Sequence, residues 1–208
     1  MSSPRNSARQ YGVALRAMLV LTVVLGVAYP LAMTAFGQLA LPNHANGSLI
    51  SSGSTGQDTT IVGSSLIGQS FTDADGAALP AWFQSRPSAA GDGYDAAASS
   101  GSNLGPENSD LIDAIATRQA AIAESDGVTV SQIPADAVTA SASGLDPQIS
   151  PEYARLQVTR VAEARGLPVE TVSALVESKI QGRDLGFLGE PTVNVLELNL
   201  ALRSLDQG

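Results

Sequence analysis

Few residue types in this sequence could carry covalent or metal chemistry. The chain has no cysteine and one histidine, His44. A thiol nucleophile and a zinc–thiolate site are therefore excluded, and a Ser/His/Asp triad or a histidine-based metal site would have to be built around His44 alone. The one lysine, Lys179, follows no G-x-x-x-x-G pattern, so a Walker-type phosphate loop is absent. We predict no catalytic residue, no metal site and no intrinsic cofactor.

Acidic side chains offer a second kind of chemistry, general acid–base catalysis. The run Asp73-Ala74-Asp75-Gly76 opens like a calcium loop, but the residues after it supply neither a third ligand nor a closing glutamate. We interpret it as a hydrated turn. Asp92 and Asp95 could act as a general acid and a general base. Such groups leave hydrolysis open as one of two candidate functions: with the apolar anchor described below, the chain would be a membrane-anchored extracytoplasmic hydrolase that uses loop carboxylates. The glycine, serine and alanine around them are typical of a solvated loop, which is the favoured interpretation.

A segment rich in serine, glycine and alanine, 85–106, holds the best candidates for a binding site. Short hydroxyl and amide side chains beside one arginine suit a partner's backbone or an anion. The same residue types also cap and turn loops, and Arg86 could simply pair with Asp95 or Asp146. Loop architecture, partner contact and nucleotide or ion binding all stay open. The candidates are Ser85, Arg86, Ser88, Ser102 and Asn103.

A long apolar segment near the N-terminus has the features of a membrane anchor for the rest of the chain. No charged residue occurs between Arg16 and Asp58, and roughly 20 apolar residues at about 1.5 Å rise cross a hydrocarbon core. The sequence therefore predicts a transmembrane helix over 17–41. It is too long for the apolar part of a signal peptide and has no clean A-x-A site, so a retained anchor is favoured.

Proline and small residues mark one part of this helix. Proline removes a helical hydrogen bond, so we expect a bend near Tyr29 and Pro30. Gly26 and Ala28 could form a close helix–helix face beside it. We predict that these four residues pack against another membrane helix.

The charges on either side of the segment predict its orientation. Arg5, Arg9 and Arg16 precede it with no acid among them, and short segments rich in arginine stay in the cytoplasm. We expect a cytoplasmic segment over 1–16, a tether loop over 42–59 and an extracytoplasmic soluble domain over 60–208. The residues after the helix hold eight basic and 20 acidic side chains, a net charge of −12. Such a charge argues against nucleic acid as a partner.

The soluble part has the pattern of a single α+β domain with a small sheet and about four helices. Short β-type runs at Thr60–Val62, Leu66–Gln69 and Trp82–Ser85 predict the sheet. Helical spacing, capping residues and closing glycines predict the helices, within 108–127, 150–166, 169–182 and 194–205. The second and third helices have the spacing of a helix-turn-helix. Their acidic character and predicted location favour a helical hairpin instead.

Six blocks of the sequence, in order, resemble one protein family. The resemblance is to the KdpC family, the C subunits of the Kdp potassium-transporting P-type ATPase, and covers nearly the whole chain from the apolar segment to Leu205. The blocks are NGSLI (46–50), GSSLIGQSF (63–71), FQSRPSA (83–89), SSGSNLGP (99–106), VTASASGLDP (138–147) and GEPTVNVLELNLAL (189–202). The residues in them that could contact a partner or a nucleotide are Gln84, Ser85, Arg86, Ser88, Ser102, Asn103, Ser141, Ser143 and Asp146.

The resemblance implies a non-catalytic accessory subunit of a high-affinity potassium pump. Its partners would be a potassium-binding, channel-like A subunit, an ATPase B subunit and a small F subunit. The family also implies a role as catalytic chaperone that raises the ATP affinity of the B subunit, and ATP enters only through this resemblance. The predicted topology puts the domain outside the cell, so an effect on ATP affinity would be indirect, through the conformational state of the pump.

Overall fold

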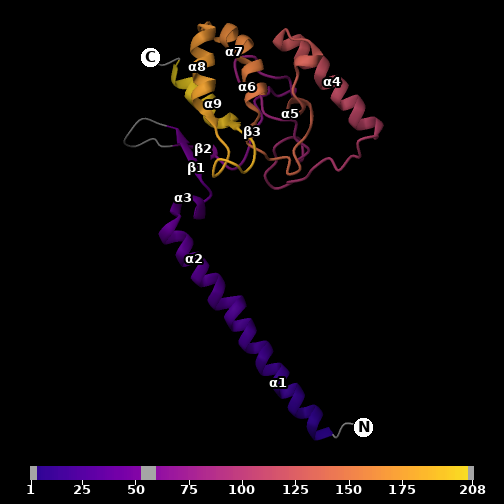
Figure 1. The fold of residues 1–208 in the computed structure, drawn as a ribbon, viewed down its shortest axis with the longest axis vertical. Coiled ribbons are helices and arrows are strands. Elements are labelled where there is room, and N and C mark those ends of the chain that lie inside the picture. The colour runs from indigo at the N-terminus through magenta and orange to yellow at the C-terminus, as the bar shows by residue number, and fades with distance from the viewer. Residues whose placement is uncertain (1–3, 53–59, 206–208) are drawn as a thin grey trace. The chain divides into compact units, whose positions relative to one another are not determined.

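The computed structural model describes residues 4–52 and 60–205 (Figure 1). The chain divides into two compact units, Met1–Leu49 and Ile50–Gly208. The first unit holds the N-terminal helix, and the second holds most of a small two-stranded sheet together with a domain of helices and short strands.

One long helix with a single irregular turn makes up most of the first unit. Pro30 has no N–H, and its ring would collide with the carbonyl of Gly26, so the backbone widens just before it. The N–H of Tyr29 accordingly bonds to the oxygen of Val24, five residues back. The helix is disturbed next to the predicted position and continues beyond Pro30. Its parts are α1 (Pro4–Val23), the π-helical turn η1 (Val24–Ala28) and α2 (Tyr29–Ala40).

This helix is long and apolar enough to cross a membrane. The candidate span, Arg9–Ala40, has 32 residues and a mean hydropathy of 2.1, whereas roughly 20 residues suffice. None of its most apolar window is covered by the rest of the chain. The span includes nearly all of the transmembrane helix predicted over 17–41.

The segment predicted to be a tether loop, 42–59, is partly regular. Pro42–Ala45 forms α3, with proline at the first position, where its missing N–H costs nothing. Leu49–Ser52 forms β1 and pairs with β2 (Thr60–Ser64), which confirms the first predicted strand. The loop prediction is therefore corrected at these positions. The rest of the tether, 53–59, lies outside the described residues.

Strands of only two or three residues build the main sheet of the domain. Val193 in the central strand lies opposite Ile149 on one side and Ile180 on the other, and it is fully buried. Strands this short show no alternation of apolar and polar residues, so the sequence did not predict them. The sheet is antiparallel, in the order β3 (Gln148–Ile149), β5 (Thr192–Asn194) and β4 (Ile180–Gln181).

Two of the three predicted strands are not strands in the structure. Leu66–Gln69 contributes one isolated bridge, between Ser64 and Ile67. Trp82–Ser85 pairs with no strand among the described residues. The backbone of Phe83 and Gln84 is instead bonded by side chains from two helical regions.

The four predicted helices are present, and one of them is broken. Asn108 caps α4 by accepting from the N–H of Asp110, and Gly127 ends it in the left-handed region at φ 66°. The helix capped by Ser150 divides at Gln157 into two. Short helical turns, η2 (Val130–Gln132) and α5 (Ala135–Val138), complete the domain. The main helices are α4 (Ser109–Asp126), α6 (Pro151–Leu156), α7 (Val158–Arg165), α8 (Val169–Lys179) and α9 (Val195–Leu205).

The core lies between α6–α9 and the three-stranded sheet, in the region where these helices cluster in Figure 1. Phe83 enters it from the loop that precedes the candidate site and is fully buried. Burying a side chain of this size stabilises a fold by about 1.5–3 kcal/mol. The structure thus confirms the α+β fold with one apolar N-terminal helix. Phe83 holds the start of the candidate site against the core. The largest fully buried apolar side chains are Phe83, Ile149, Leu198, Leu202, Val161, Val172, Val176, Val193 and Val195.

Candidate functional site

Two buried amide side chains hold the backbone that leads into the site. Asn199 accepts from the N–H of Phe83 at 3.0 Å and donates to its carbonyl at 2.9 Å. Gln157 accepts from the N–H of Gln84 at 2.6 Å and donates to its carbonyl at 3.3 Å. Each amide thus makes the pair of bonds that a neighbouring strand would make. No local pattern marks either residue as part of the site, although each is a polar residue within a predicted helix.

The first two candidate residues tie the preceding loop together. The side chain of Gln84 donates to the carbonyls of Phe71, Leu79 and Trp82, at 3.0–3.2 Å. The hydroxyl of Ser85 donates to the carbonyl of Gln69 at 2.8 Å. Both side chains therefore serve the loop's own architecture.

Arg86 pairs with Asp146, one of the two acids predicted for it. Its Nη1 lies 3.1 Å from Oδ2 of Asp146, and both side chains are about a quarter exposed, at 23% and 29%. The other carboxylate oxygen, Oδ1, accepts from the N–H of Gln148 at 3.0 Å. Nε of Arg86 is buried, and within 4–52 and 60–205 no hydrogen-bond partner reaches it. A partly exposed ion pair of this kind is worth at most about 1 kcal/mol, so its main effect is to join the loop to 138–148.

Ser88 is the centre of a tight turn. Its hydroxyl donates to the carbonyl of Gly144 at 2.6 Å and accepts from the N–H groups of Ala90 and Tyr94. Tyr94 in turn donates to the carbonyl of Arg86 at 2.8 Å. Burial raises the pKa of Tyr94 to about 12, with a smaller opposing contribution from Ser85. Tyr94 carried no motif that would have marked it as part of the site.

The segment around Ser143 closes the site from the other side. The hydroxyls of Ser141 and Ser143 lie 3.4 Å apart, and the carbonyl of Ser143 accepts from the N–H of Ser100 at 3.0 Å. A Cβ at position 144 would lie 2.6 Å from the carbonyl oxygen of Ser100 and 2.8 Å from the nitrogen of Ala90. Only glycine fits there, also because φ is +66°.

Two predicted members do not join this network. Ser102 and Asn103 are both exposed. The Asn103 amide donates to the nearby carbonyl of Gly101 at 3.2 Å, and its φ of 53° is that of a turn residue. The Asn103 amide thus bonds within its own turn, and its contact with a partner or nucleotide stays a prediction.

Arg86 lines two hollows that are open to a ligand: one of about 570 Å³ that it shares with Asp146, and one of about 300 Å³ beside Ser85 and Ser88. Arg118 also lines the smaller hollow, and its Nη1 donates to the carbonyl of Val138 at 2.9 Å. Two arginines and several hydroxyls could bind a small anion or a partner's carbonyl groups. Among the described residues there is no group of three or more histidine or acidic side chains placed to hold a metal ion.

The predicted membrane-packing residues all lie within η1 and α2. Gly26, Ala28, Tyr29 and Pro30 are uncovered by the rest of the chain. Apart from the helix's own nearby backbone, the one described atom within 4 Å of a Cβ at position 26 would be the methyl carbon of Thr22, at 3.9 Å. The chain itself therefore leaves room for a larger side chain there, and packing of this face against another helix stays a prediction.

Comparison with known proteins shows similarity over almost the full length. The family model described as "KdpC: K+-transporting ATPase, c chain" matches residues 11–204. Three curated relatives carry the name "Potassium-transporting ATPase KdpC subunit". The protein from Kineococcus radiotolerans is 54% identical over 199 residues, which are 96% of this chain and 95% of the relative. The Caulobacter vibrioides protein is 56% identical over 190 residues, 91% of this chain and 90% of the relative. The Mycobacterium tuberculosis protein is 50% identical over 198 residues, 95% of this chain and 99% of the relative.

Proposed function

The chain belongs to the KdpC family of potassium-transporting ATPase c chains, and on that premise we propose that it is a membrane-anchored, non-catalytic accessory subunit of such a pump. The match over residues 11–204 carries this proposal, because it takes in both the apolar helix and the folded domain. The partners would be the B subunit, which is the ATPase, the potassium-binding A subunit and the small F subunit. The role would be to assemble and stabilise them.

The arrangement of charge supports an extracytoplasmic domain. Arg9 and Arg16 lie in the first half of the long helix, and no arginine or lysine follows until Arg86. Arginine-rich flanks remain on the cytoplasmic side. A topology reporter fused after Gly208 should be active only in its extracytoplasmic form. If a cytoplasmic reporter at the same position were active instead, the proposed topology would be wrong and the domain would lie in the cytoplasm.

The use of polar groups in the site supports an accessory role over hydrolysis. Gln84, Ser85 and Ser88 hold backbone groups of their own domain. The loop carboxylate of Asp95 accepts from the N–H of Ala97 at 2.8 Å, as in an Asx turn. These groups are committed to structure, which disfavours the hydrolase hypothesis. Turnover of an ester or phosphoester by the purified full-length chain would favour it.

An effect on ATP affinity fits this arrangement as an indirect one. A domain outside the cell can favour one conformation of the pump if it contacts two conformations differently, and that changes ATP affinity at a distant site. ATP itself would not touch the domain. Direct contact would require the reverse topology.

The acidity of the domain suggests a second contribution to transport. With 20 acidic and eight basic side chains after the helix, the domain would raise the local concentration of potassium near the mouth of the channel-like partner. Salt limits the reach of this field to about 8–10 Å. Neutralising exposed acids should lower apparent potassium affinity at low ionic strength, and the difference should vanish at high salt.

Co-purification tests the proposal as a whole. The tagged full-length chain, produced with the other pump subunits and extracted in mild detergent, should bring them down together. A chain that purifies alone under conditions that keep the remaining subunits associated would refute the proposal.

A further inference from the structure

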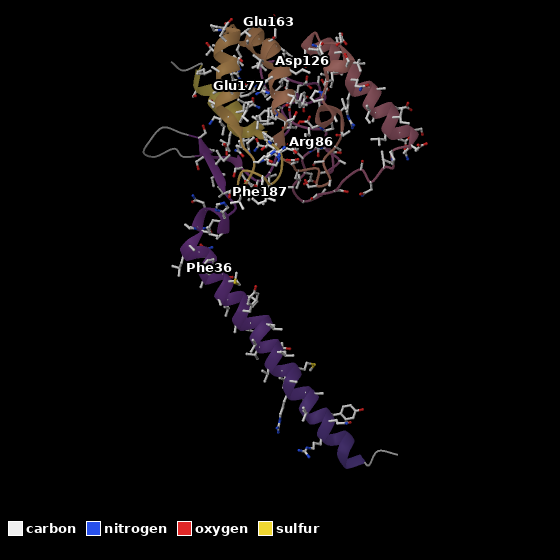
Figure 2. The ribbon with its side chains drawn as sticks, viewed as in Figure 1. Phe36, Arg86, Asp126, Glu163, Glu177 and Phe187 are labelled. Atoms are coloured by element: carbon white, nitrogen blue, oxygen red, sulfur yellow. The ribbon has the colours of Figure 1, made fainter. Side chains whose placement is uncertain are left out.

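A short hairpin between β4 and β5 exposes an unusual amount of apolar surface. Leu185 is 83% exposed and Phe187 is 69% exposed, the two highest values for large apolar side chains in the described part of the domain, and Leu188 beside them is 49% exposed. Figure 2 shows Phe187 at the margin of the domain. Contiguous exposed apolar side chains framed by polar residues mark interaction sites in soluble domains.

The hairpin is held in its shape by its own backbone. Asp184 and Leu188 exchange two hydrogen bonds of 2.9 Å, and the N–H of Phe187 bonds to the carbonyl of Asp184 at 3.2 Å. Leu185, at the tip, has a φ of 53°, a conformation that leucine rarely adopts. An ion pair between Arg183 and Glu190 closes the base at 2.5 Å. A surface ordered before binding loses little entropy when it binds.

The hairpin is also fixed to the core. β4 and β5 pair through Gln181 and Thr192, directly below the hairpin, and through Ile180 and the fully buried Val193. The apolar tip therefore projects from a rigid base.

We propose that the hairpin 183–190 inserts Leu185, Phe187 and Leu188 into an apolar recess on the extracytoplasmic face of a larger membrane subunit of the pump. This rests on the proposed function, which puts the domain beside such subunits. Large apolar anchors surrounded by charged residues are the usual energetic centre of a protein interface.

The negative charge of the domain favours a pump subunit over two other occupants of this site, an anionic lipid surface and a second copy of the chain. An anionic lipid surface would repel a domain with 20 acidic and eight basic side chains, and the one basic residue of the hairpin, Arg183, is already paired with Glu190. A second copy of the domain would bring the same excess of negative charge. A subunit whose recess has a neutral or basic rim is complementary to Asp184, the hairpin's remaining charged side chain.

Cross-linking identifies the occupant directly. The natural chain has no cysteine, so Leu185→Cys creates a single attachment point for a photoreactive maleimide. In the assembled complex the product should join this chain to one of the two large partners, the channel-like protein or the ATPase. Ile112→Cys, on α4 and 54% exposed, serves as the matched control and should give no such product. Cross-linking of Leu185→Cys to a second copy, or to lipid alone, would overturn the proposal.

A second pair of variants measures the contribution to binding. The double variant Leu185→Ser/Phe187→Ser should raise the dissociation constant of the chain from the complex by at least about tenfold. Ile112→Ser should leave it unchanged, and the domain of all variants should unfold at the wild-type temperature. If the hairpin variant binds normally while the wild type co-purifies with the pump, the hairpin proposal fails and the proposed function stands. If the wild type does not co-purify, the proposed function itself fails.

Discussion

The buried ion pair between Arg160 and Asp126 allows the sharpest test of what holds the domain together. Nε of Arg160 lies 2.8 Å from Oδ1 of Asp126, and the two side chains are only 8% and 4% exposed. The remaining donors of Arg160 reach the carbonyls of Pro80 and Trp82 and the amide oxygen of Gln157. The guanidinium thus joins α4, α7 and the loop before the candidate site.

Removing the carboxylate should cost much of the domain's stability. Asp126→Ala leaves a positive charge buried without compensation, and breaking one side of a buried pair costs about 3–5 kcal/mol. A folded domain has only about 5–15 kcal/mol in total. For a chain of this size the unfolding temperature should fall by roughly 6–20 °C. Asp126→Asn keeps an acceptor for Nε but removes the charge, so it should lie between Asp126→Ala and wild type.

The chain contains its own reporter for this measurement. Trp82 is the one tryptophan, it stacks on Phe71 with ring centres 6.0 Å apart, and Arg165 lies 4.4 Å above its ring. Urea unfolding of the full-length protein in detergent, followed by tryptophan fluorescence, gives the free energy of unfolding. Glu177→Ala, which breaks an ion pair about half exposed on both sides, is the control and should barely move the midpoint. A loss below about 1 kcal/mol for Asp126→Ala would refute the argument from burial.

Three further predictions concern other parts of the domain. Because burial raises the pKa of Tyr94 to about 12, the protonated phenol stabilises the fold below pH 10, the ordinary pKa of tyrosine, and this contribution is lost as pH rises through about 12. Burial raises the pKa of Tyr153 too, but that residue is present in both proteins, so the difference between the ultraviolet titrations of wild type and Tyr94→Phe should be one phenol that ionises late. The hydrogen bond from Arg155 lowers the pKa of Glu177. This pair therefore stabilises the fold above the ordinary pKa of glutamate, and the stabilisation is lost as pH falls through the lowered pKa. Glu177→Gln should remove this dependence of stability on acid pH, and high salt should weaken the same dependence in wild type. Gly144→Ala should lower the free energy of unfolding in urea more than Gly127→Ala does. Both glycines have φ +66°, a conformation that alone costs alanine about 1–2 kcal/mol, but of the two only position 144 has backbone atoms within 3 Å of an added Cβ. Equal losses would show that the contacts at 144 relax freely.

The sequence predicted those elements whose ends carry local signals. Asn108 before α4 and Gly127 after it are a side-chain cap and a left-handed stop, and both act within a few residues of the helix. Ser150 caps α6 by accepting from the N–H of Tyr153. The apolar helix was predictable for the same reason, because its length and lack of charge are properties of one continuous segment.

The parts that were not predicted depend on contacts between distant residues. β3, β4 and β5 have at most three residues each, and they are strands only because they meet one another. The extended backbone at Phe83 was recognised as extended, but its partner is Asn199, a side chain 116 residues away. Within the candidate site, the pairing of Arg86 with Asp146 was one of two predicted, while Tyr94 was missed because a lone tyrosine in a loop has no local pattern.

The buried amides that bind Phe83 and Gln84 determine how a force on the loop would spread. Gln157 and Asn199 belong to the helix layer, and Gln157 also accepts from Arg160 at 2.8 Å. A partner that pulls on Arg86 therefore pulls, two residues away, on a segment fastened to α9 and to the junction of α6 and α7. Because these bonds fasten the loop to the helices, a displacement at Arg86 would be passed on to α9 and to the junction of α6 and α7 rather than absorbed by the loop alone.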